Sequence, residues 1–330
     1  MIASPSLMRA FVYERYGEPR EVMHRVQVPL PDPGPGAIRV RVSASSINAA
    51  DQRLARADPF LARLDNGLFR PRKRRILGAD VCGVVDAIGE GITRWKVGDE
   101  VFGSSMAMGA FAEAMTLRED EVTRRPAGVS VHACAAAPLA GITAIQAVRE
   151  RAKLRKGQRV LVMGAGGGVG TMVVQLAKAY GAHVTALCGA ASVALVRSLG
   201  ADEVVDHARG AEPKGSFDAV LGVNGYRSLA TYLAWLERGG VYVMVGGNNR
   251  QIFEALLLGK LRFLGSGRRL EVLTIDERLR RQDLAELSAL LADGRVKPVV
   301  ERVVPFAEIP EAMSAAWGGH VGGKIVVEVG

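Results

Sequence analysis

The chain has 330 residues, of which 48% are hydrophobic and 23% charged, a composition typical of a globular protein with about two domains. No apolar run is long enough to span a bilayer, and residues 1–5 lack the basic and hydrophobic regions of a signal peptide. Scattered cysteines argue against a disulfide framework, so we expect a cytoplasmic protein in a reducing compartment: Cys82, Cys134 and Cys188.

The formal net charge of +9 raises the question of nucleic-acid binding. The densest basic run is Arg70–Arg75, which contains no aromatic residues that would stack on bases. We interpret it as a solvated loop and expect neither nucleic acid nor a membrane as a partner. A modest positive field that attracts a phosphorylated small molecule explains the sign of the charge.

The first third of the chain is typical of β structure, because short apolar or alternating runs are separated by Pro and Gly. A helical region covers about residues 131–153. The expected strands lie at residues 8–13, 22–28 and 38–44, in a pair within 77–101, and at 111–117.

The strongest local signal begins at the apolar strand 160–163, which runs into a glycine-dense turn at 164–170 and then a helical pattern at 171–178. A strand, turn and helix in this order present free backbone N–H groups and the positive end of a helix dipole to a pyrophosphate. Glycine leaves room for the phosphate and permits the sharp turn. A turn with no ligand is the alternative interpretation of a lone motif.

Strands and helices alternate after this turn, which predicts a doubly wound parallel sheet. This pattern ends near Leu264. A helix at 283–292, strands at 299–304 and 324–329 and a helix at 309–316 follow, and we expect them to complete the N-terminal β domain. The alternating elements are strands at 182–188, 202–206, 217–223 and 240–245 and a helix at 193–199.

Several of these segments resemble motifs of the medium-chain dehydrogenase/reductases. Gly78–Val85 is similar to their G-x-D-x-x-G-x-V segment, and Val97–Gly103 to their G-D-x-V-x-G turn. Ala165–Gly170 resembles the phosphate loop of the quinone oxidoreductase (zeta-crystallin-like) branch. The similarity also includes Pro138–Ala144 and the C-terminal Gly323–Val326, so it covers nearly the whole chain.

The resemblance implies a fold of class α/β, with a GroES-like β domain and a doubly wound Rossmann domain with a parallel sheet. The GroES-like catalytic domain would be discontinuous, at residues 1–125 and 266–330. The Rossmann NAD(P)-binding domain would occupy residues 126–265. The active site would lie in the cleft between the domains, and many relatives are homodimers or homotetramers.

The same resemblance argues against a metal. Zinc alcohol dehydrogenases of this family need Cys, His and a further Cys or acid in a tetrahedral arrangement. The position of the first ligand resembles Asn48 and that of the histidine resembles Ala79, and the structural zinc lobe is missing. We therefore predict no zinc. The isolated histidines are expected to be surface or packing residues: His24, His132, His183, His207 and His320.

Candidate catalytic residues follow from the position of the family's catalytic centre. Asn48 carries an amide donor for the substrate or the nicotinamide, and its alternative role is a hydrogen bond that organises the loop. Arg53 is a candidate for stabilising charge, with a solvent-facing side chain as the alternative. Asp51 is expected to be structural, and Asp80 to orient the same loop. Ala50 stands where relatives with zinc carry a proton-relay hydroxyl.

The cofactor choice rests on the segment after the second Rossmann strand, where NAD enzymes usually carry an acid. Residues 187–192 contain no acid, and the usual basic clamp of the relatives is also missing, so Ser192 and Arg197 are expected to substitute for it. We predict NADPH, with NADH as the alternative. The Asn and Gly residues at 224 and 246–247 could equally serve turns. The predicted cofactor-binding residues are Thr143, Ala165, Gly166, Gly167, Gly168, Val169, Gly170, Cys188, Ser192, Arg197, Asn224, Gly246 and Gly247.

Three functional hypotheses remain. The first is a zinc-independent reductase that transfers hydride from NADPH to an activated C=C bond of a small-molecule quinone, enone or enoyl substrate. The second is a carbonyl or alcohol reductase, or a biosynthetic tailoring reductase, of the same fold. The third is a dinucleotide-binding protein with little catalysis, which the absence of an obvious acid–base residue favours.

Overall fold

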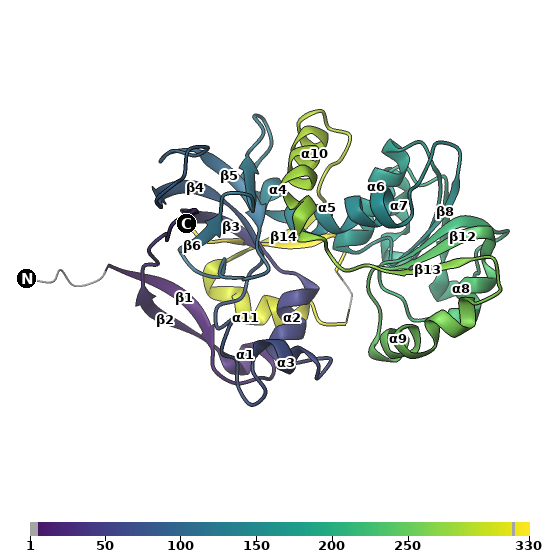
Figure 1. The fold of residues 1–330 in the computed structure, drawn as a ribbon, viewed down its shortest axis with the longest axis horizontal. Helices are drawn as coiled ribbons and strands as arrows, with labels where there is room; N and C mark the ends of the chain where they lie inside the picture. Colours follow the sequence, from purple (N-terminus) through teal and green to yellow (C-terminus); the bar gives the residue numbers. More distant parts are fainter. Residues whose placement is uncertain (1–5, 319–320) are drawn as a thin grey trace, which may run out of the picture. The chain divides into compact units, whose positions relative to one another are not determined.

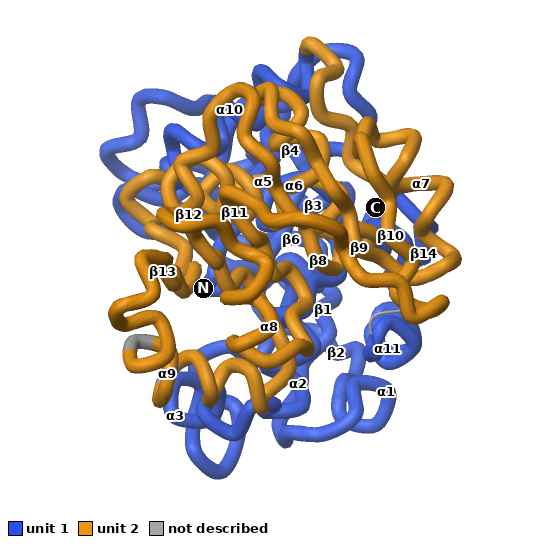
Figure 2. The backbone as a smooth tube through the Cα atoms, turned by 90° about the vertical axis from the view of Figure 1, so that its right-hand side faces the viewer, with its two compact units in different colours: residues 1–139, 280–292, 300–330 blue, residues 140–279, 293–299 orange. Residues whose placement is uncertain are grey.

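The computed structural model describes residues 6–318 and 321–330, so the predictions on the N-terminal segment 1–5 and on His320 lie outside the described residues. The chain divides into two compact units (Figures 1 and 2). Unit 1 contains residues 1–139, 280–292 and 300–330, and unit 2 contains residues 140–279 and 293–299. Both ends of the sequence therefore build unit 1, as its blue colour in Figure 2 shows.

Unit 1 is built on a seven-stranded sheet with the order β14-β15-β3-β4-β5-β7, in which β6 also pairs with β3. A separate two-stranded sheet joins β1 and β2. The strands are β1 (Leu7–Tyr13), β2 (Met23–Pro29), β3 (Ala37–Ser46), β4 (Asp80–Ile88), β5 (Glu100–Ser104), β6 (Ala114–Arg118), β7 (Val122–Arg124), β14 (Val300–Pro305) and β15 (Lys324–Glu328). The helices are α1 (Pro19–Val22), α2 (Ala49–Arg56), α3 (Ala62–Asn66), α4 (Val131–Ala136), α10 (Arg280–Ala292), η5 (Phe306–Glu308) and α11 (Ile309–Ala315).

Strand β3 organises this sheet because it pairs antiparallel with β4, β6 and β15. Its sequence alternates as a strand with one buried face requires. Ile38, Val40 and Val42 are buried in the unit 1 core, whereas Arg41 is exposed between them. The C-terminal strand β15 joins β3 directly, so residues at opposite ends of the chain share one core.

Unit 2 is a six-stranded parallel sheet with the order β10-β9-β8-β11-β12-β13, and the predicted doubly wound Rossmann class is confirmed. Its central strands β8 and β9 are almost continuously apolar, as in sheets that are buried on both faces. The strands are β8 (Arg159–Met163), β9 (His183–Cys188), β10 (Glu203–Asp206), β11 (Phe217–Gly222), β12 (Leu236–Met244) and β13 (Arg269–Val272).

The helices of unit 2 connect these strands, and α5 (Pro138–Ile145) enters the unit from its first residues in unit 1. The π-helical segment η1 continues from α5. The remaining helices are η1 (Gln146–Arg151), α6 (Gly168–Ala179), η2 (Ala190–Ser192), α7 (Val193–Ser198), η3 (His207–Arg209), α8 (Leu229–Ala234), α9 (Asn249–Phe263) and η4 (Glu277–Leu279).

The expectation that the doubly wound pattern ends near Leu264 is wrong. Strand β13 pairs in parallel with β12 and extends the sheet to Val272. Its sequence, Arg-Leu-Glu-Val, is too short and too polar to be recognised as a buried strand. The 15-residue helix α9 also carries no clean amphipathic pattern, so the sequence did not indicate it.

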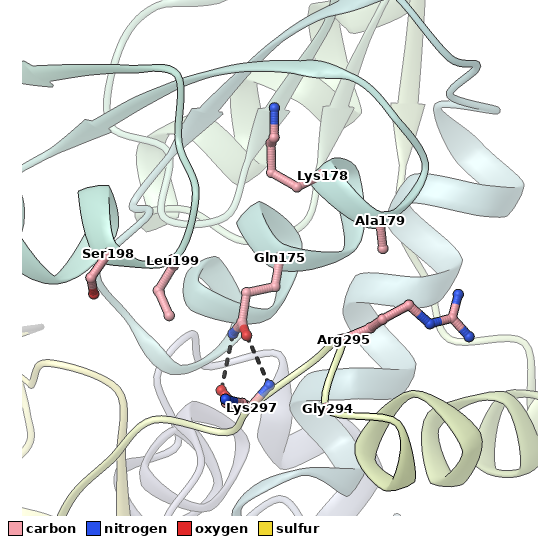
Figure 3. A pocket seen from close by; sticks show the side chains of 8 residues that line it. All are labelled: Gln175, Lys178, Ala179, Ser198, Leu199, Gly294, Arg295 and Lys297. Atoms are coloured by element: carbon pink, nitrogen blue, oxygen red, sulfur yellow. Dashed lines mark hydrogen bonds between the residues drawn. The ribbon is translucent and has the colours of Figure 1, made fainter.

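The compact units divide the chain at 139/140 and 279/280, whereas the predicted domain boundaries are 125/126 and 265/266. The first difference arises because α4 packs on β3 and β4 of unit 1. The second arises because β13 still belongs to the unit 2 sheet. The short segment 293–299 returns to unit 2, where the Gln175 amide donates to Lys297 O at 3.0 Å and accepts from Lys297 N at 2.8 Å (Figure 3).

None of the helices in the described part of the chain has both the length and the apolar character that a membrane crossing requires.

Two leucines in unit 1 strands test the core assignment. Leu117 in β6 is 2% exposed and belongs to the core, whereas Leu7 in β1 is 60% exposed. Leu117→Ala should lower the free energy of unfolding by about 2–5 kcal/mol, because it removes buried apolar surface and leaves a cavity. Leu7→Ala is the matched control, with an expected change within about 0.5 kcal/mol in urea unfolding. Equal losses would contradict the placement of β6.

Candidate functional site

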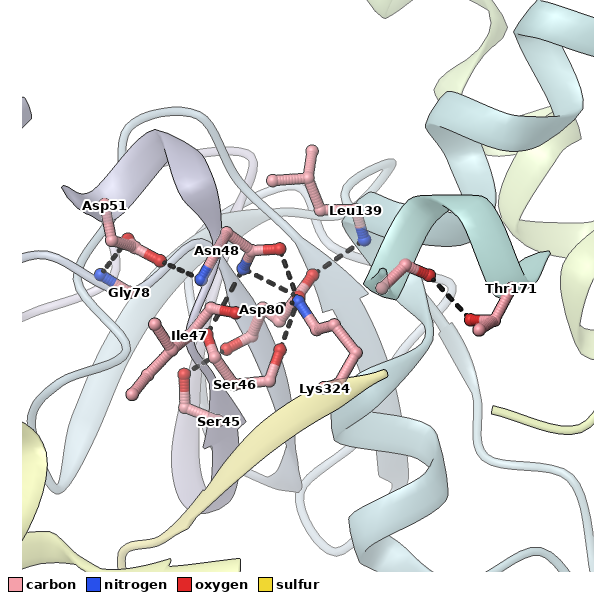
Figure 4. Close-up of polar contacts among 11 residues, drawn as sticks. Ser45, Ser46, Ile47, Asn48, Asp51, Gly78, Asp80, Leu139, Thr171 and Lys324 are labelled. Atoms are coloured by element: carbon pink, nitrogen blue, oxygen red, sulfur yellow. Dashed lines mark hydrogen bonds and ion pairs between the residues drawn. The ribbon is translucent and has the colours of Figure 1, made fainter. Parts of the chain in front are cut away.

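The glycine turn connects β8 to α6, as the sequence predicts. A Cβ on Gly170 would clash with the carbonyl oxygen of Gly164, so the first turn of α6 can approach the strand end only with glycine there. The helix begins after Gly167, and no side chain caps its N-terminus. Thr171 turns its hydroxyl back to Gly168 O at 3.0 Å (Figure 4). The backbone N–H groups of the first turn are thus available to an anion.

Loops from the neighbouring strands meet this turn, because carboxyl ends of parallel strands share one edge of the sheet. Ser192, after β9, lies directly against Gly166, since a Cβ on that glycine would clash with the serine hydroxyl. Asn224, after β11, lies against Gly164 at 3.0 Å from its built Cβ position. Gly246, after β12, accepts from Gly225 N at 3.1 Å. The structure therefore brings four of the predicted segments together.

Gln251 on α9 organises the outer loops and was missed by the sequence reasoning. It is 2% exposed, and its Nε2 donates to the Tyr242 hydroxyl at 2.8 Å. The Gln251 amide fills the space beside Gly225 and Gly247, where any Cβ would clash with it. The pairing of the two glycines as a β-bridge keeps the ends of β11 and β12 in register. An isolated glutamine in a weakly patterned helix offers no sequence signal for this role.

Two other predicted cofactor-binding residues lie on helices rather than in the loops at this edge of the sheet. Thr143 is half-buried on α5, and Arg197 is exposed in the last turn of α7. Their role toward a cofactor stays a prediction.

The end of β9 has both a histidine and an acid beside it. The His207 Nε2 lies 3.7 Å from the position of a Cβ built on Gly189. Asp206 is opposite Cys188 in the β9–β10 register, but it accepts from Ala208 N at 2.9 Å and pairs with Arg209 at 3.4 Å. Burial raises the pKa of Cys188 to about 11, so its thiol is protonated at neutral pH. His207 was expected to be a surface or packing residue.

Unit 1 contains a second polar cluster, centred on the buried carboxylate of Asp80 (Figure 4). Its Oδ2 accepts from Ser46 Oγ at 2.7 Å, Asn48 Nδ2 at 2.9 Å and Lys324 Nζ at 3.3 Å. Its Oδ1 accepts from Leu139 N at 2.7 Å. The carboxyl group is thus hydrogen-bonded on both oxygens and paired with the Lys324 side chain, as burial of such a group requires.

Both polar atoms of the Asn48 side chain are hydrogen-bonded. Its Nδ2 donates to Ser46 O at 3.2 Å as well as to Asp80, and its Oδ1 accepts from Lys324 Nζ at 2.5 Å. It is also the N-cap residue of α2. The geometry therefore matches the alternative in which Asn48 organises the loop. A direct contact with substrate stays a prediction.

Asp51 completes a capping box at the start of α2. Its carboxylate accepts from Asn48 N at 2.8 Å and from Gly78 N at 2.9 Å. Burial raises the pKa of Asp51 to about 6, although both hydrogen bonds act in the opposite direction. Arg53 is half-buried on the same helix, more than one turn beyond Asn48.

The residues at the family's zinc position do not fit a zinc ion. The amide oxygen of Asn48 is occupied by the ammonium group of Lys324, and Ala79 is a buried methyl group. Within residues 6–318 and 321–330, no three His, Cys, Asp or Glu side chains group together as a metal site. A zinc ion at the Asn48 amide oxygen would have to displace the Lys324 ammonium group, because two positive charges at one site repel each other.

Lys324 is the main residue of this cluster that the sequence reasoning missed. In the sequence, Lys324 stands out only as part of the C-terminal motif Gly-Lys-Ile-Val. Its side chain is buried at the start of the apolar strand β15, and Nζ also donates to Ile47 O at 3.1 Å. A lysine at the start of a buried strand is a weak signal by itself, because many such lysines extend to solvent.

Comparisons with known proteins agree with this architecture. A profile of the alcohol dehydrogenase GroES-like domain matches residues 34–127, and one described as zinc-binding dehydrogenase matches residues 199–327. The chain is 34% identical to a chloroplast envelope quinone oxidoreductase homolog of Arabidopsis thaliana, covering 98% of both chains. It is 30% identical to a mitochondrial NAD(P)H oxidoreductase of Mus musculus, covering 99% of this chain and 90% of the relative.

The structure of a quinone oxidoreductase from Coxiella burnetii has the same fold, with a TM-score of 0.85, 24% identity and coverage of 98% and 100% of the two chains. Together these matches show that the chain belongs to the medium-chain dehydrogenase/reductases, a superfamily of NAD(P)H-dependent oxidoreductases. Within that superfamily it is a member of the quinone oxidoreductase branch. Two relatives are named for the chloroplast envelope and the mitochondrion, and cytoplasmic localisation stays a prediction.

Asp51 makes the stability of unit 1 depend on pH. Its folded pKa of about 6 exceeds the value of 3.8 for an unperturbed carboxyl, so the folded state binds this proton more tightly. The resulting stabilisation is complete below pH 3.8 and is lost as the pH rises through 6. Relative to Asp51→Asn, the wild type should therefore lose about 1–3 kcal/mol between about pH 4 and about pH 7.

Urea unfolding of both proteins at the two pH values measures this difference. Asp32→Asn, at an exposed position, is the control and should follow the wild type at both pH values. Parallel pH profiles of the wild type and Asp51→Asn would show that Asp51 does not carry the shift.

Proposed function

We propose that the protein is a zinc-independent, NADPH-dependent reductase that transfers hydride to an activated C=C bond of a quinone, enone or enoyl substrate. The observation that carries this proposal is the uncapped N-terminus of α6 behind the glycine turn. It provides anion-binding N–H groups in a chain whose relatives include quinone oxidoreductases.

The residues of unit 2 fit a dinucleotide. The N–H groups of Gly168, Val169 and Gly170 would hold the pyrophosphate, and the α6 dipole would favour its charge. A Cβ built on Gly167 would meet only the carbonyl oxygen of Gly164, at 3.7 Å, so no side chain fills the turn there. When bound, the nicotinamide supplies the hydride that reduces the carbon β to a substrate carbonyl.

Preference for NADPH is supported by the side chains at the end of β9. A 2′-phosphate there would meet the Ser192 hydroxyl and the His207 ring, which lie beside Gly166 and Gly189. The acid that selects NADH in many Rossmann enzymes is absent from residues 187–192, and Asp206 is already engaged by Arg209.

Negative charge that develops on the substrate carbonyl oxygen requires hydrogen-bond donors. Arg53 is the candidate donor from α2, and water supplies the final proton. We assign Asn48 to positioning, because Asp80 and Lys324 already hold its amide. The proposed reaction uses no zinc, because the donor groups at the family's zinc position do not fit it.

The function is tested by titrating the purified protein with NADPH and NADH, and then offering quinones and short enones. With deuterium in the transferred position of NADPH, C=C reduction labels the β carbon of the product, whereas carbonyl reduction labels the carbinol carbon. Label on the carbinol carbon would replace the proposal by the carbonyl reductase hypothesis. Tight binding without turnover of any substrate in the panel would point to a specialised substrate outside the panel or to the non-catalytic hypothesis.

The phosphate site is tested by Gly168→Asp. A carboxylate at the first residue of α6 should repel the pyrophosphate and weaken NADPH binding by roughly a hundredfold or more, measured by fluorescence titration. Gly34→Asp is the matched control, because nothing lies within 4 Å of a Cβ built at Gly34. Unchanged affinity in Gly168→Asp would refute this placement of the phosphate.

Cofactor preference is tested by Ser192→Asp. A carboxylate beside the proposed 2′-phosphate should lower NADPH affinity at least about tenfold and leave NADH affinity within about threefold. Ser198→Asp, at an exposed position on the same connection, adds the same charge as a control. Equal losses for NADPH and NADH would indicate damage to the glycine turn rather than a 2′-phosphate contact.

A further inference from the structure

A cluster of large apolar side chains is exposed on α3 and the loop after it. Phe69 is 87% exposed, Leu64 68% and Phe60 59%, and Leu61 and Leu68 are also exposed. Single exposed apolar residues are common on protein surfaces, but five within ten residues form a concentrated surface. We refer to these five residues as the apolar tip.

The loop that carries the apolar tip is closed by specific hydrogen bonds. Asn66 is fully buried, its O accepts from Arg72 N at 2.8 Å, and its Oδ1 accepts from Arg74 N at 2.8 Å. Gly67 has a φ of +125°, a conformation that only glycine adopts readily, and its O accepts from the Tyr16 hydroxyl at 2.7 Å. The exposure of Leu68 and Phe69 is therefore a consequence of a defined loop that points them outward.

Basic residues adjoin the apolar tip. Residues 58–75 contain six Arg or Lys and two Asp. Asp65 pairs with both Lys73 and Arg74, and Arg75 pairs with Glu14. Arg70 and Arg72 are exposed immediately after Phe69. The surface thus combines apolar side chains with an excess of positive charge.

We infer that residues 60–75 form a docking surface for a bilayer that contains anionic lipids. Phe and Leu side chains at a closed loop would enter the interface, while the flanking arginines would contact lipid phosphates. Nucleic acid fits less well, because three of the five apolar residues are leucines, which offer no ring for base stacking. The sequence alone favours a solvated loop with no membrane partner, and the exposure of the apolar side chains in the structure is what changes that expectation.

Vesicle co-sedimentation of the full chain tests this inference without any enzymatic readout. Wild-type protein should bind vesicles of equimolar phosphatidylcholine and phosphatidylserine, and bind pure phosphatidylcholine much less. Binding should fall as salt rises, because exposed charges are screened. The double variant Leu68→Ser with Phe69→Ser should reduce binding at least about tenfold, and Arg70→Glu with Arg72→Glu should do the same.

Controls carry changes of the same kind elsewhere. Val97→Ser removes an apolar side chain that is 60% exposed, and Arg25→Glu with Arg155→Glu reverses two exposed charges. Both controls should bind anionic vesicles within about threefold of wild type. Thermal unfolding of every variant verifies that the fold is retained.

Several results would overturn the inference: no binding of wild type to anionic vesicles, equal losses in the controls, or full binding by the Leu68/Phe69 double variant. Polyglutamate or single-stranded RNA that binds as strongly as vesicles, with no loss in that double variant, would indicate a polyanion partner instead. A change of oligomeric mass in the same variant would indicate contact with a second copy of this chain. All these outcomes are independent of the proposed reductase activity.

Discussion

The buried carboxylate of Asp80 is the constraint on which the architecture of unit 1 depends. It joins β4 to the end of β3 through Ser46, to the N-cap of α2 through Asn48, to the start of α5 through Leu139 N, and to β15 through Lys324. Removal of one partner from such a buried pair typically costs about 3–5 kcal/mol, because the other charge is left without compensation. Residues from both ends of the sequence must therefore be in place before this charge can be buried.

The same constraint supports our proposal that this chain works without zinc. An ammonium group is held against the amide of Asn48 by Asp80, so the positive charge near the α2 N-terminus belongs to the protein itself. Lys324 carries this charge at the start of β15, whose apolar residues belong to the unit 1 core, so the charge is held without metal ligands. Asp51 sits beside this network as a buried carboxyl with a raised pKa, and it links the α2 N-terminus to Gly78 N.

Unit 2 depends on a steric rather than an electrostatic constraint. The ends of its parallel strands carry small residues where loops must approach one another closely: Gly164 faces Asn224, Gly166 faces Ser192, and Gly247 faces Gln251. Side chains at these glycines would separate the loops and close the space at the α6 N-terminus. The anion binding that we propose at this edge would thus rest on packed backbone rather than on charged side chains.

The sequence by itself determined the fold class, the glycine turn and the family, because these depend on local patterns: apolar strands, glycines at fixed spacing and short motifs. It identified Asn48 and Asp80 as neighbours of one loop through the resemblance. Only the tertiary structure decided their partners, since Lys324 lies 244 residues after Asp80 in the chain. Strand β13 was missed because its four residues are polar or not fully buried and its place is fixed by backbone pairing with β12, and helix α9 was missed because it carries no clean amphipathic pattern. The apolar tip was hidden for the same reason: whether Phe69 faces a core or solvent depends on how Asn66 closes its loop, and no local periodicity encodes that contact.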